Sequence, residues 1–223
     1  MGRDLRDRVI VITGASSGIG AATAVEAARR GMDIVAAARR VEKLEGVAAR
    51  VRDLGRRVEV VPCDVADEGQ VDQLITRTME RFGRLDVMLV NAGYGFMRPI
   101  DLLDDRMHRH IFEVNYFGTV RCVRKALPPM RAARRGHIVI TSSVVGRVGI
   151  PNYTAYSATK AAQDALATGL RAELEPEGID VTAVYPVGTR TDFFEVSAAV
   201  GGQDTIRENT PQALMQRPEH VAR

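Results

Sequence analysis

The sequence has few cysteines, few lysines, no long apolar run and no strong excess of one charge. Its two cysteines, Cys63 and Cys122, lack a second cysteine or histidine at the spacing of metal ligands, and spacing alone does not predict a disulfide between them. We therefore expect two buried free thiols in a reducing compartment.

The apolar runs are too short to cross a bilayer, because a membrane-spanning helix needs about 20 apolar residues. Residues 1–8 are charged and lead directly into a short apolar strand, so they lack the apolar stretch and cleavage site of a signal peptide. These absences predict a cytoplasmic protein with no membrane partner.

The two signs of charge are nearly balanced, with 31 basic and 28 acidic residues, a net charge of +3 and a pI near 9.1. They are mixed through the same segments, and basic pairs such as Arg134-Arg135 end predicted helices, where cations stay solvated. We therefore expect no nucleic-acid partner. Only Lys43, Lys125 and Lys160 are lysines, so the position of each is informative.

Histidine is also scarce, and none of the four histidines is placed like a metal ligand. His108 and His110 are two residues apart on a predicted helix and so point away from each other, which favours surface or packing roles. The sequence predicts no metal site.

Hydrophobic residues make up 45% of the chain, enough for a buried core, and no linker or repeat divides it. Short apolar runs alternate with longer amphipathic stretches. Strands are predicted at residues 9–12, 34–37, 58–61, 87–90, 137–140 and 181–185, and helices at 18–30, 41–54, 68–82, 104–134 and 155–175. Continuous apolar strands are typical of a parallel sheet covered on both faces. We therefore predict a single α/β domain over residues 1–223, a doubly wound parallel sheet of Rossmann type with helices on both faces.

Residues 192–218 break this pattern, with Gly201-Gly202 and scattered polar residues. In doubly wound folds, ligands bind at the carboxyl ends of the strands, and the loops there carry function. We predict that this segment is a mobile substrate loop over the site. Residues 218–221 resemble the first turn of a helix that has a proline at its start.

A glycine-rich loop, T-G-A-S-S-G-I-G, follows the first predicted strand directly. Gly14 permits a tight turn, Gly18 lets the backbone approach a pyrophosphate, and Gly20 lets the helix pack closely on the strand. The phosphates would lie at a helix N-terminus with free N–H donors. The alternative is an ordinary strand-to-helix turn, which more often uses one glycine than three. We predict dinucleotide binding by Gly14, Ser16, Ser17, Gly18, Ile19 and Gly20.

The second predicted strand ends in Ala38-Arg39-Arg40, where a site for NAD would place Asp or Glu on the ribose 2′-hydroxyl. A guanidinium in that place can stack on adenine and bind a 2′-phosphate. Arg39, with Arg40 as second candidate, therefore predicts NADP(H) as the preferred cofactor, with NAD(H) possible. The alternative is that both arginines only begin the next helix in solvent. Asp33 does not supply the missing acid, because it precedes the predicted strand.

Ser143 and the segment from Tyr156 to Lys160 carry a pattern that resembles the Y-x-x-x-K signature of the short-chain dehydrogenase/reductase family. The resemblance covers nearly the whole chain. It includes, in order, the loop T-G-x-x-x-G-x-G, Asp64-Val65, Asn91-Ala92-Gly93, Asn115 and Ser143, thirteen residues before Tyr156. It implies an enzyme that interconverts an alcohol and a ketone or aldehyde by hydride transfer with NAD(P)(H).

The chemistry of these residues supports the same interpretation. A tyrosine has an unperturbed pKa near 10, so at neutral pH it is a poor base until a cation stabilises its phenolate. Tyr156 and Lys160 are four residues apart on one helix face, so Lys160 can supply that charge. Tyr156 is therefore predicted to be the general acid and base, and Ser143 to hydrogen-bond the same substrate oxygen. Tyr153 lies seven residues from Lys160 and is assigned to packing or to the pocket wall.

Other roles come from the resemblance alone. It implies that Lys160 also binds the nicotinamide ribose and that Asn115 holds a water that relays protons through Lys160. An amide within a helix can also simply bond a neighbouring backbone group, which is the alternative for Asn115. Asp64 could equally cap a helix. In the family, the positions at the adenine and the cofactor riboses correspond here to Asp64, Val65, Asn91, Ala92 and Gly93.

After the sixth strand the family usually reads Pro-Gly, whereas this chain has Pro186-Val187-Gly188, with Thr191 five residues after the proline. The resemblance implies that Pro186, Val187, Gly188 and Thr191 meet the nicotinamide, with a local backbone altered by the displaced glycine. The family normally adds a further helix and a closing strand beyond the point at which this sequence ends.

Together these features predict an NADP(H)-dependent oxidoreductase that acts on a small-molecule alcohol or carbonyl. The alternative is an NADP(H)-binding regulator without turnover, which the intact set of Ser143, Tyr156, Lys160 and Asn115 disfavours. The resemblance also implies a homodimer or homotetramer that associates through the long helices. Apolar pocket candidates, which could equally belong to the core, are Phe96, Met97, Val144, Val145, Tyr153, Phe193 and Phe194.

Overall fold

The computed structural model describes residues 4–193 and 215–223. Residues 194–214, which include Phe194 and most of the predicted substrate loop, lie outside the described residues. Within the described ranges, no helix is both long enough and apolar enough to cross a membrane.

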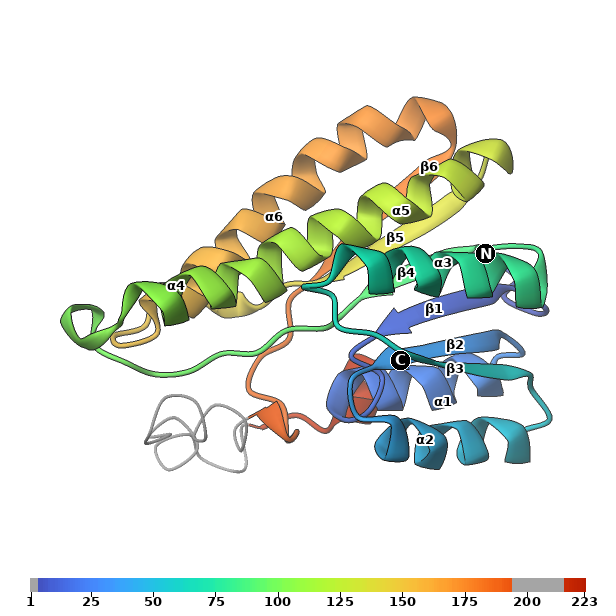
Figure 1. Cartoon of the computed structure of the whole chain (residues 1–223), viewed down its shortest axis with the longest axis horizontal. Coiled ribbons are helices and arrows are strands. Elements are labelled where there is room, and N and C mark those ends of the chain that lie inside the picture. The colour runs from blue at the N-terminus through green and yellow to red at the C-terminus, as the bar shows by residue number, and fades with distance from the viewer. Residues whose placement is uncertain (1–3, 194–214) are drawn as a thin grey trace.

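In the described part of the chain, six parallel strands form one sheet in the order β3-β2-β1-β4-β5-β6 (Figure 1). The strands are β1 (Val9–Thr13), β2 (Asp33–Ala38), β3 (Val58–Pro62), β4 (Val87–Val90), β5 (Gly136–Thr141) and β6 (Ile179–Val184). The order reverses between β1 and β4, and ligands of open α/β sheets bind in the crevice at such a point. The predicted doubly wound parallel sheet is confirmed.

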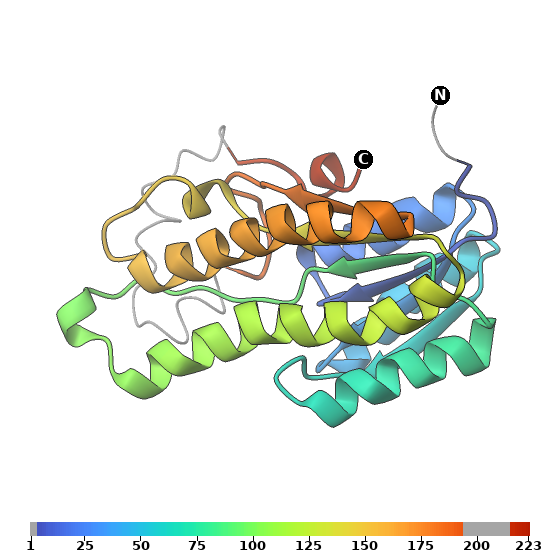
Figure 2. The same ribbon diagram turned by 90° about the horizontal axis from the view of Figure 1, so that it is seen from above.

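Helices cover both faces of the sheet (Figure 1). One face carries α1 (Gly18–Arg29), α2 (Val41–Asp53) and α9 (Pro218–Val221), which packs against α1. The other face carries α3 (Glu68–Phe82), α5 (Gly118–Ala132) and α6 (Thr154–Leu174), and α4 (Asp105–Phe112) extends past the carboxyl ends of the strands. Figure 2 shows α5 and α6 running side by side, so that residues far apart in the sequence meet between them.

Successive side chains of each strand point to opposite faces of the sheet. Val9, Val11 and Val35 pack in the cluster formed with α3, α5 and α6, whereas Ile10 and Ile12 pack in the cluster formed with α1 and α2. Every residue of β1 and β2 is buried. This burial on both sides explains why the strands read as continuous apolar runs.

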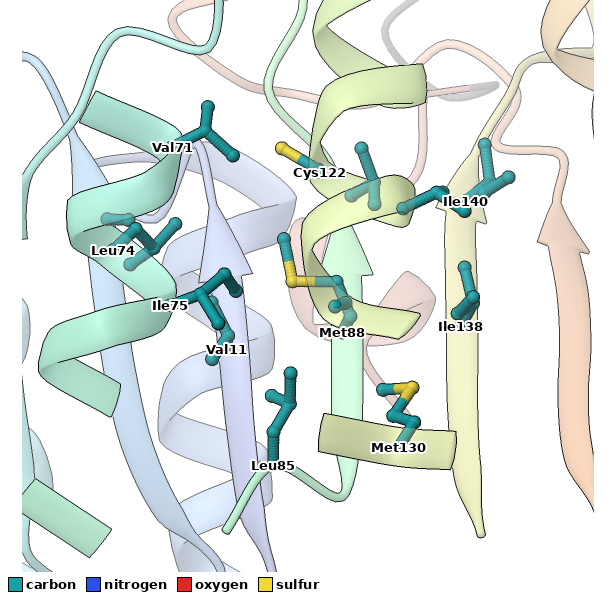
Figure 3. Packing of buried hydrophobic residues seen from close by; sticks show 14 of the residues in the cluster. Val11, Val71, Leu74, Ile75, Leu85, Met88, Cys122, Met130, Ile138 and Ile140 are labelled. Atoms are coloured by element: carbon teal, nitrogen blue, oxygen red, sulfur yellow. The ribbon is translucent and has the colours of Figure 1, made fainter. Parts of the chain in front are cut away.

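The larger core lies between the sheet and the helices α3 and α5 (Figure 3). Leu74 and Ile75 of α3, and Cys122 and Met130 of α5, contribute buried side chains to it. Cys63 is buried as well, and both cysteines are free, as expected. The core therefore uses the cysteines as small apolar residues.

Predicted and observed elements agree to within two residues at either end. The main difference lies within the predicted helix 104–134. Helical structure does run from residue 105 to residue 132, but Glu113–Phe117 form a π-helical turn between α4 and α5. A π turn holds one more residue than an α turn, so it changes which side chains face inward, and it often marks a functional place. Asn115 lies in this turn.

Ion pairs gather at the amino ends of the strands. Asp86, just before β4, accepts hydrogen bonds from Arg84 at 2.6 Å and Arg8 at 3.0 Å. Asp33 pairs with Arg57 at 2.5 Å. Asp33 is the first residue of β2, not the residue before the strand as predicted, but it lies at the edge opposite the glycine-rich loop. It therefore does not provide the acid that an NAD site would use.

Candidate active site

A cleft of about 930 Å³ opens at the carboxyl ends of the strands, over the point where the strand order reverses. Nearly every residue that the sequence assigned to a cofactor or to catalysis lines it. These are Gly14, Ser16, Ser17, Gly18, Ile19, Arg39, Arg40, Asp64, Val65, Asn91, Ala92, Gly93, Ser143, Tyr156, Lys160, Pro186, Val187, Gly188 and Thr191. Gly20 and Asn115 are buried and do not line it.

The loop between β1 and α1 needs its glycines. Gly14 and Gly18 have φ angles of +67° and +56°, in the left-handed region that favours glycine. A Cβ on Gly20 would lie 2.4 Å from the carbonyl oxygen of Gly14, so α1 could not pack this closely on β1 with a side chain there. Ser17 precedes α1 and its side chain makes no capping hydrogen bond, so it does not occupy the N–H donors of the first turn. Such donors suit a phosphate.

Cations and hydroxyls gather around the carboxylate of Asp192 at one end of the cleft. Arg40 Nη1 and Lys43 Nζ lie 3.2 and 2.6 Å from Asp192 Oδ2. Arg40 Nη2 donates to Ser17 Oγ at 2.8 Å and to Ser16 Oγ at 3.3 Å. The hydrogen bond from Lys43 is the main reason that the pKa of Asp192 is below its ordinary value. This cluster offers the donors that a phosphate monoester requires.

Arg39 has a different environment from Arg40. Its side chain is 69% exposed, against 44% for Arg40, and its ion-pair partner is Asp64, 3.7 Å away. Asp64 does not cap α3, because the cap is Asp67, whose side chain accepts from the backbone N–H of Gln70 at 3.1 Å. Asp64 therefore lines the cleft next to Arg39, and the capping alternative is wrong.

Asn91 joins the ends of β1 and β4. Its backbone N–H donates to Thr13 Oγ1 at 3.0 Å, and its side-chain Nδ2 donates to the carbonyl oxygens of Thr13 at 3.1 Å and Gly14 at 3.3 Å. The side chain thus fixes the start of the glycine-rich loop at the cleft.

Tyr156, Lys160 and Ser143 meet in the cleft. Tyr156 is 7% exposed, and Lys160 Nζ lies 5.6 Å from the centre of its ring. Burial raises the pKa of Tyr156 above its ordinary value, and a hydrogen bond with Ser143 opposes that rise. Burial also lowers the pKa of Lys160 to about 7. Buried titratable groups whose pKa values are displaced in opposite directions are typical of proton-transfer sites.

Asn115 bonds to the backbone of the loop after β4. Its Oδ1 accepts from the N–H of Tyr94 at 3.0 Å, and its Nδ2 donates to the carbonyl of Tyr94 at 2.8 Å and to Thr159 Oγ1 at 3.1 Å. The side chain therefore fills the structural role that the sequence left open as an alternative. A water relay through Asn115 stays a prediction.

Apolar side chains form the wall beside Tyr156. The rings of Tyr153 and Phe193 lie 4.7 and 5.4 Å from its ring, between centres. Phe96 and Met97 do not line the cleft, and Phe96 is 2% exposed within an apolar cluster. Of the predicted pocket residues, the cleft is lined by Val144, Val145, Tyr153 and Phe193.

Sequence reasoning missed polar groups on α4 and on the loop after β4. Tyr94 and His110 line the cleft, with 2.7 Å between the Tyr94 hydroxyl and His110 Nδ1. Burial raises the pKa of Tyr94 to about 12. Arg106 lines the cleft one turn before His110. The spacing of four residues between Arg106 and His110, which places both on one helix face, was a signal that could have found them.

The chain after β6 runs along the cleft to the glycine-rich loop. The carbonyl of Pro186 accepts from Ser143 Oγ at 3.4 Å. A Cβ built on Gly18 would lie 2.8 Å from the methyl carbon of Thr191, so Thr191 packs directly on that glycine. Contact of this segment with a nicotinamide stays a prediction.

The sequence matches the profile of the short chain dehydrogenase family over residues 8–199. It is 38% identical over 223 residues to the cis-4-hydroxycyclohexanecarboxylate dehydrogenase of Sinomonas cyclohexanicum, with 100% of this chain and 89% of that protein covered. It is 37% identical over 202 residues to an uncharacterised oxidoreductase of Mycobacterium tuberculosis, with 86% of this chain covered. The chain spans 59% of the length of that mycobacterial relative.

The structure is also similar to solved ones. An alcohol dehydrogenase from the archaeon Thermococcus sibiricus, in complex with 5-hydroxy-NADP, superimposes with a TM-score of 0.85 at 29% identity. The superposition covers 97% of this chain and 88% of that chain. The likeness therefore extends over the whole sheet and its helices.

Proposed function

The chain belongs to the short-chain dehydrogenase/reductase family of oxidoreductases, and on this basis we propose that it interconverts an alcohol and a ketone or aldehyde with NADP(H). One observation carries the proposal. Tyr156, Lys160 and Ser143 line the same cleft as the glycine-rich loop and Arg40, and Lys43 pairs with Asp192 at the end of the cleft where Arg40 lies. Association through the long helices remains a prediction.

The cation end of the cleft fits the phosphates of NADP(H). Gly14 and Gly18 hold the loop in a left-handed conformation before the first turn of α1, where a pyrophosphate would bind. Arg40 and Lys43 already surround an anionic group, the carboxylate of Asp192. A 2′-phosphate carries the same sign of charge and more acceptors, so it would compete with Asp192 for these donors. Bound there, the cofactor supplies the hydride.

Tyr156 supplies the proton. In reduction, its O–H donates to the substrate oxygen while the carbonyl carbon accepts the hydride. Ser143 donates a hydrogen bond to the same oxygen and stabilises the charge that develops there. The ammonium of Lys160, 5.6 Å from the ring centre, favours the phenolate that Tyr156 becomes. In oxidation, Tyr156 takes the proton from the alcohol instead.

The lining of the cleft supports a substrate with an apolar body and an acidic group. Tyr153 and Phe193 place apolar rings beside Tyr156. Arg106 lines the cleft and has no ion-pair partner among residues 4–193 and 215–223. The Sinomonas relative is named for a cyclic hydroxy acid, which has these two parts. Cyclic hydroxy acids and their ketones are therefore the first substrates to assay.

The test is Tyr156→Phe, with Tyr153→Phe as the matched control in the same wall. Without its hydroxyl, residue 156 cannot transfer the proton, so we expect turnover to fall by about 10²- to 10⁴-fold while NADPH binding stays nearly unchanged. Tyr153→Phe is expected to keep most of the activity. Turnover is measured by NADPH absorbance, and binding by NADPH fluorescence.

Two outcomes would contradict the proposal. Full turnover in Tyr156→Phe would show that another group transfers the proton. A wild-type protein that binds NADPH but never oxidises it, with cyclic and open-chain ketones or aldehydes as substrates, would favour the alternative function, an NADP(H)-binding regulator without turnover.

A further inference from the structure

Gln163 is a buried amide beside the site that no feature of the sequence singled out. It lies on α6, three residues after Lys160, and is 1% exposed. Its Oε1 accepts a hydrogen bond from Lys160 Nζ at 2.9 Å. Its Nε2 donates to the main-chain carbonyl of Asn115 and to Thr119 Oγ1, both at 2.7 Å. One side chain thus connects α6 to the π turn and to α5.

The ammonium of Lys160 has three N–H donors, and two of them have partners inside the protein. The carbonyl of Thr141 accepts one at 2.8 Å, and Gln163 Oε1 accepts another at 2.9 Å. The third remains for the cleft, which Lys160 lines. Hydrogen bonds from a charged donor are stronger than those between neutral groups, so both partners favour the ammonium over the neutral amine.

The groups that face Lys160 from the neighbouring elements are neutral. β5 presents the carbonyl of Thr141 and α6 presents Gln163. The loop after β4 presents Gly93, where an added Cβ would lie 3.8 Å from Lys160 Nζ, and the Asn115 amide of the π turn lies against the same glycine. Burial is the cause that lowers the pKa of Lys160, with no contribution from a neighbouring charge.

The titratable neighbour of Lys160 is Tyr156 on its own helix. Among the residues that the structure describes, no carboxylate forms an ion pair with Lys160. The charge on Lys160 therefore depends on the two neutral acceptors, Thr141 and Gln163.

Gln163 also occupies the main-chain carbonyl of Asn115. That oxygen accepts from Gln163 Nε2 and from Thr119 Oγ1, each at 2.7 Å, and a carbonyl oxygen has two lone pairs. The family resemblance implied a water that connects Asn115 to Lys160. Here the amide of Gln163 spans the same two residues directly.

We propose that Gln163 is a positioning residue that fixes the Lys160 ammonium against the π turn, in place of a bound water, and so holds the lysine for Tyr156. The inference rests on the proposed function, because the fixed ammonium matters through Tyr156. A neutral amide donates and accepts hydrogen bonds but does not pass a proton on. Protons therefore leave Lys160 on its cleft side and not through the interior.

The scarcity of lysine makes a direct test possible. In protein labelled with ¹³C at the lysine ε carbon, Lys160 can be followed by NMR with Lys43 and Lys125 as internal references. Gln163→Met keeps a long buried side chain but removes the acceptor. We expect the pKa of Lys160 to fall by about one unit, as when a charged group loses a hydrogen bond.

The matched control is Thr78→Val, which removes a fully buried hydroxyl that donates to the Leu74 carbonyl at 2.7 Å on α3. It costs a buried hydrogen bond far from the site, so it should leave the Lys160 titration unchanged. Gln163→Glu keeps an acceptor and adds a negative charge, so it should raise the pKa of Lys160. In the wild type, the NMR chemical shifts of the Gln163 side-chain amide should change with pH, with the same midpoint as the titration of Lys160.

An unchanged Lys160 titration in the folded Gln163 variants would overturn the proposal. If neither variant folds, the wild type decides. Gln163 amide chemical shifts that do not change as Lys160 titrates would overturn the proposal. These readouts need no turnover, so they stand apart from Tyr156→Phe, which tests the reaction. Where turnover is measured, Gln163→Met should lower kcat about fivefold at neutral pH and leave KM for the carbonyl substrate nearly unchanged.

Discussion

Arg40 makes the contacts for which a phosphate on the cofactor ribose would compete. It bonds the hydroxyls of Ser16 and Ser17 and the carboxylate of Asp192. Arg39 instead extends into solvent beside Asp64, where its flat guanidinium is available to stack on an adenine. From the sequence, Arg39 was the first candidate and Arg40 the second. The contacts favour Arg40 for the phosphate.

We expect Arg40→Gln to weaken NADPH binding by about 10- to 100-fold, the loss that follows from removing a charge-assisted hydrogen bond, while NADH binding changes little. Arg39→Gln is the matched control, and its effects on NADPH affinity and on NADH affinity should differ less than those of Arg40→Gln. Dissociation constants from fluorescence titration at one fixed ionic strength check this. Equal losses for NADPH and NADH in Arg40→Gln would place the 2′-phosphate elsewhere.

The junction of β1, its loop and α1 is the element that brings the cofactor end together. Gly20→Ala would put a Cβ 2.4 Å from the Gly14 carbonyl and 2.8 Å from Asn91 Nδ2, so the helix must move off the strand. We expect the free energy of unfolding to fall by about 1–3 kcal/mol, as for an overpacked core. NADPH affinity should fall with it.

Gly46→Ala is the control for this change. Gly46 lies in the middle of α2 and a Cβ there would meet nothing within 4 Å, so alanine should raise the free energy of unfolding by about 0.5–1 kcal/mol. Urea unfolding of both variants measures whether each substitution lowers or raises the free energy of unfolding. A Gly20→Ala variant as stable as the wild type would mean that the loop relaxes without cost.

The elements that the sequence predicted well are those with a strong local pattern. Strands buried on both faces read as apolar runs, and the spacing of Tyr156 and Lys160 follows from the helical repeat. The π turn was missed because one extra residue barely disturbs the apolar period of residues 105–132. It nevertheless decides that Asn115 faces the loop after β4.

Contacts between distant residues were also missed. Gln163 meets Asn115 and Thr119 across 48 and 44 residues, and an amide within a helix carries no local sign of such partners. Lys43 meets Asp192 across 149 residues in the same way. Residue types and spacing predict chemistry within one helix or loop, whereas pairing between elements depends on how they pack.

Two buried carboxylates, Asp33 and Asp86, lie at the edge of the sheet opposite the cleft. The cleft lies at the carboxyl edge of the sheet, and Asp33 and Asp86 lie at the amino edge among arginines. Burial raises the pKa of both carboxyls, but hydrogen bonds, mainly from Arg57 and Arg84, outweigh it, and each pKa lies below its ordinary value of 3.8. These pairs therefore stabilise the folded state above that pH.

Stability should accordingly decrease in acid. As the pH falls below about 4, the unfolded carboxyls take up protons before the folded ones, so the contribution of the pairs is lost as the pH falls through the folded pKa values. Asp86→Asn should have a lower free energy of unfolding than the wild type at neutral pH. That free energy should also decrease less between about pH 5 and pH 3 than it does in the wild type. Urea unfolding across this pH range measures how the free energy of unfolding of each protein depends on pH. Equal pH dependence in the two proteins would mean that Asp86 does not contribute to the loss of stability in acid.

The two thiols lie at different depths of the molecule. Cys63 lines the cleft near Asp64, whereas Cys122 is a fully buried residue of α5 in the core (Figure 3). Burial raises the pKa of Cys63 to about 12 and raises that of Cys122 as well, so we expect both thiols to react slowly in the folded protein. We expect modification of Cys63 to follow opening of the cofactor end, and modification of Cys122 to require separation of α5 from the sheet. We therefore expect a thiol reagent to modify Cys63, which is 4% exposed, before Cys122, which is 0% exposed.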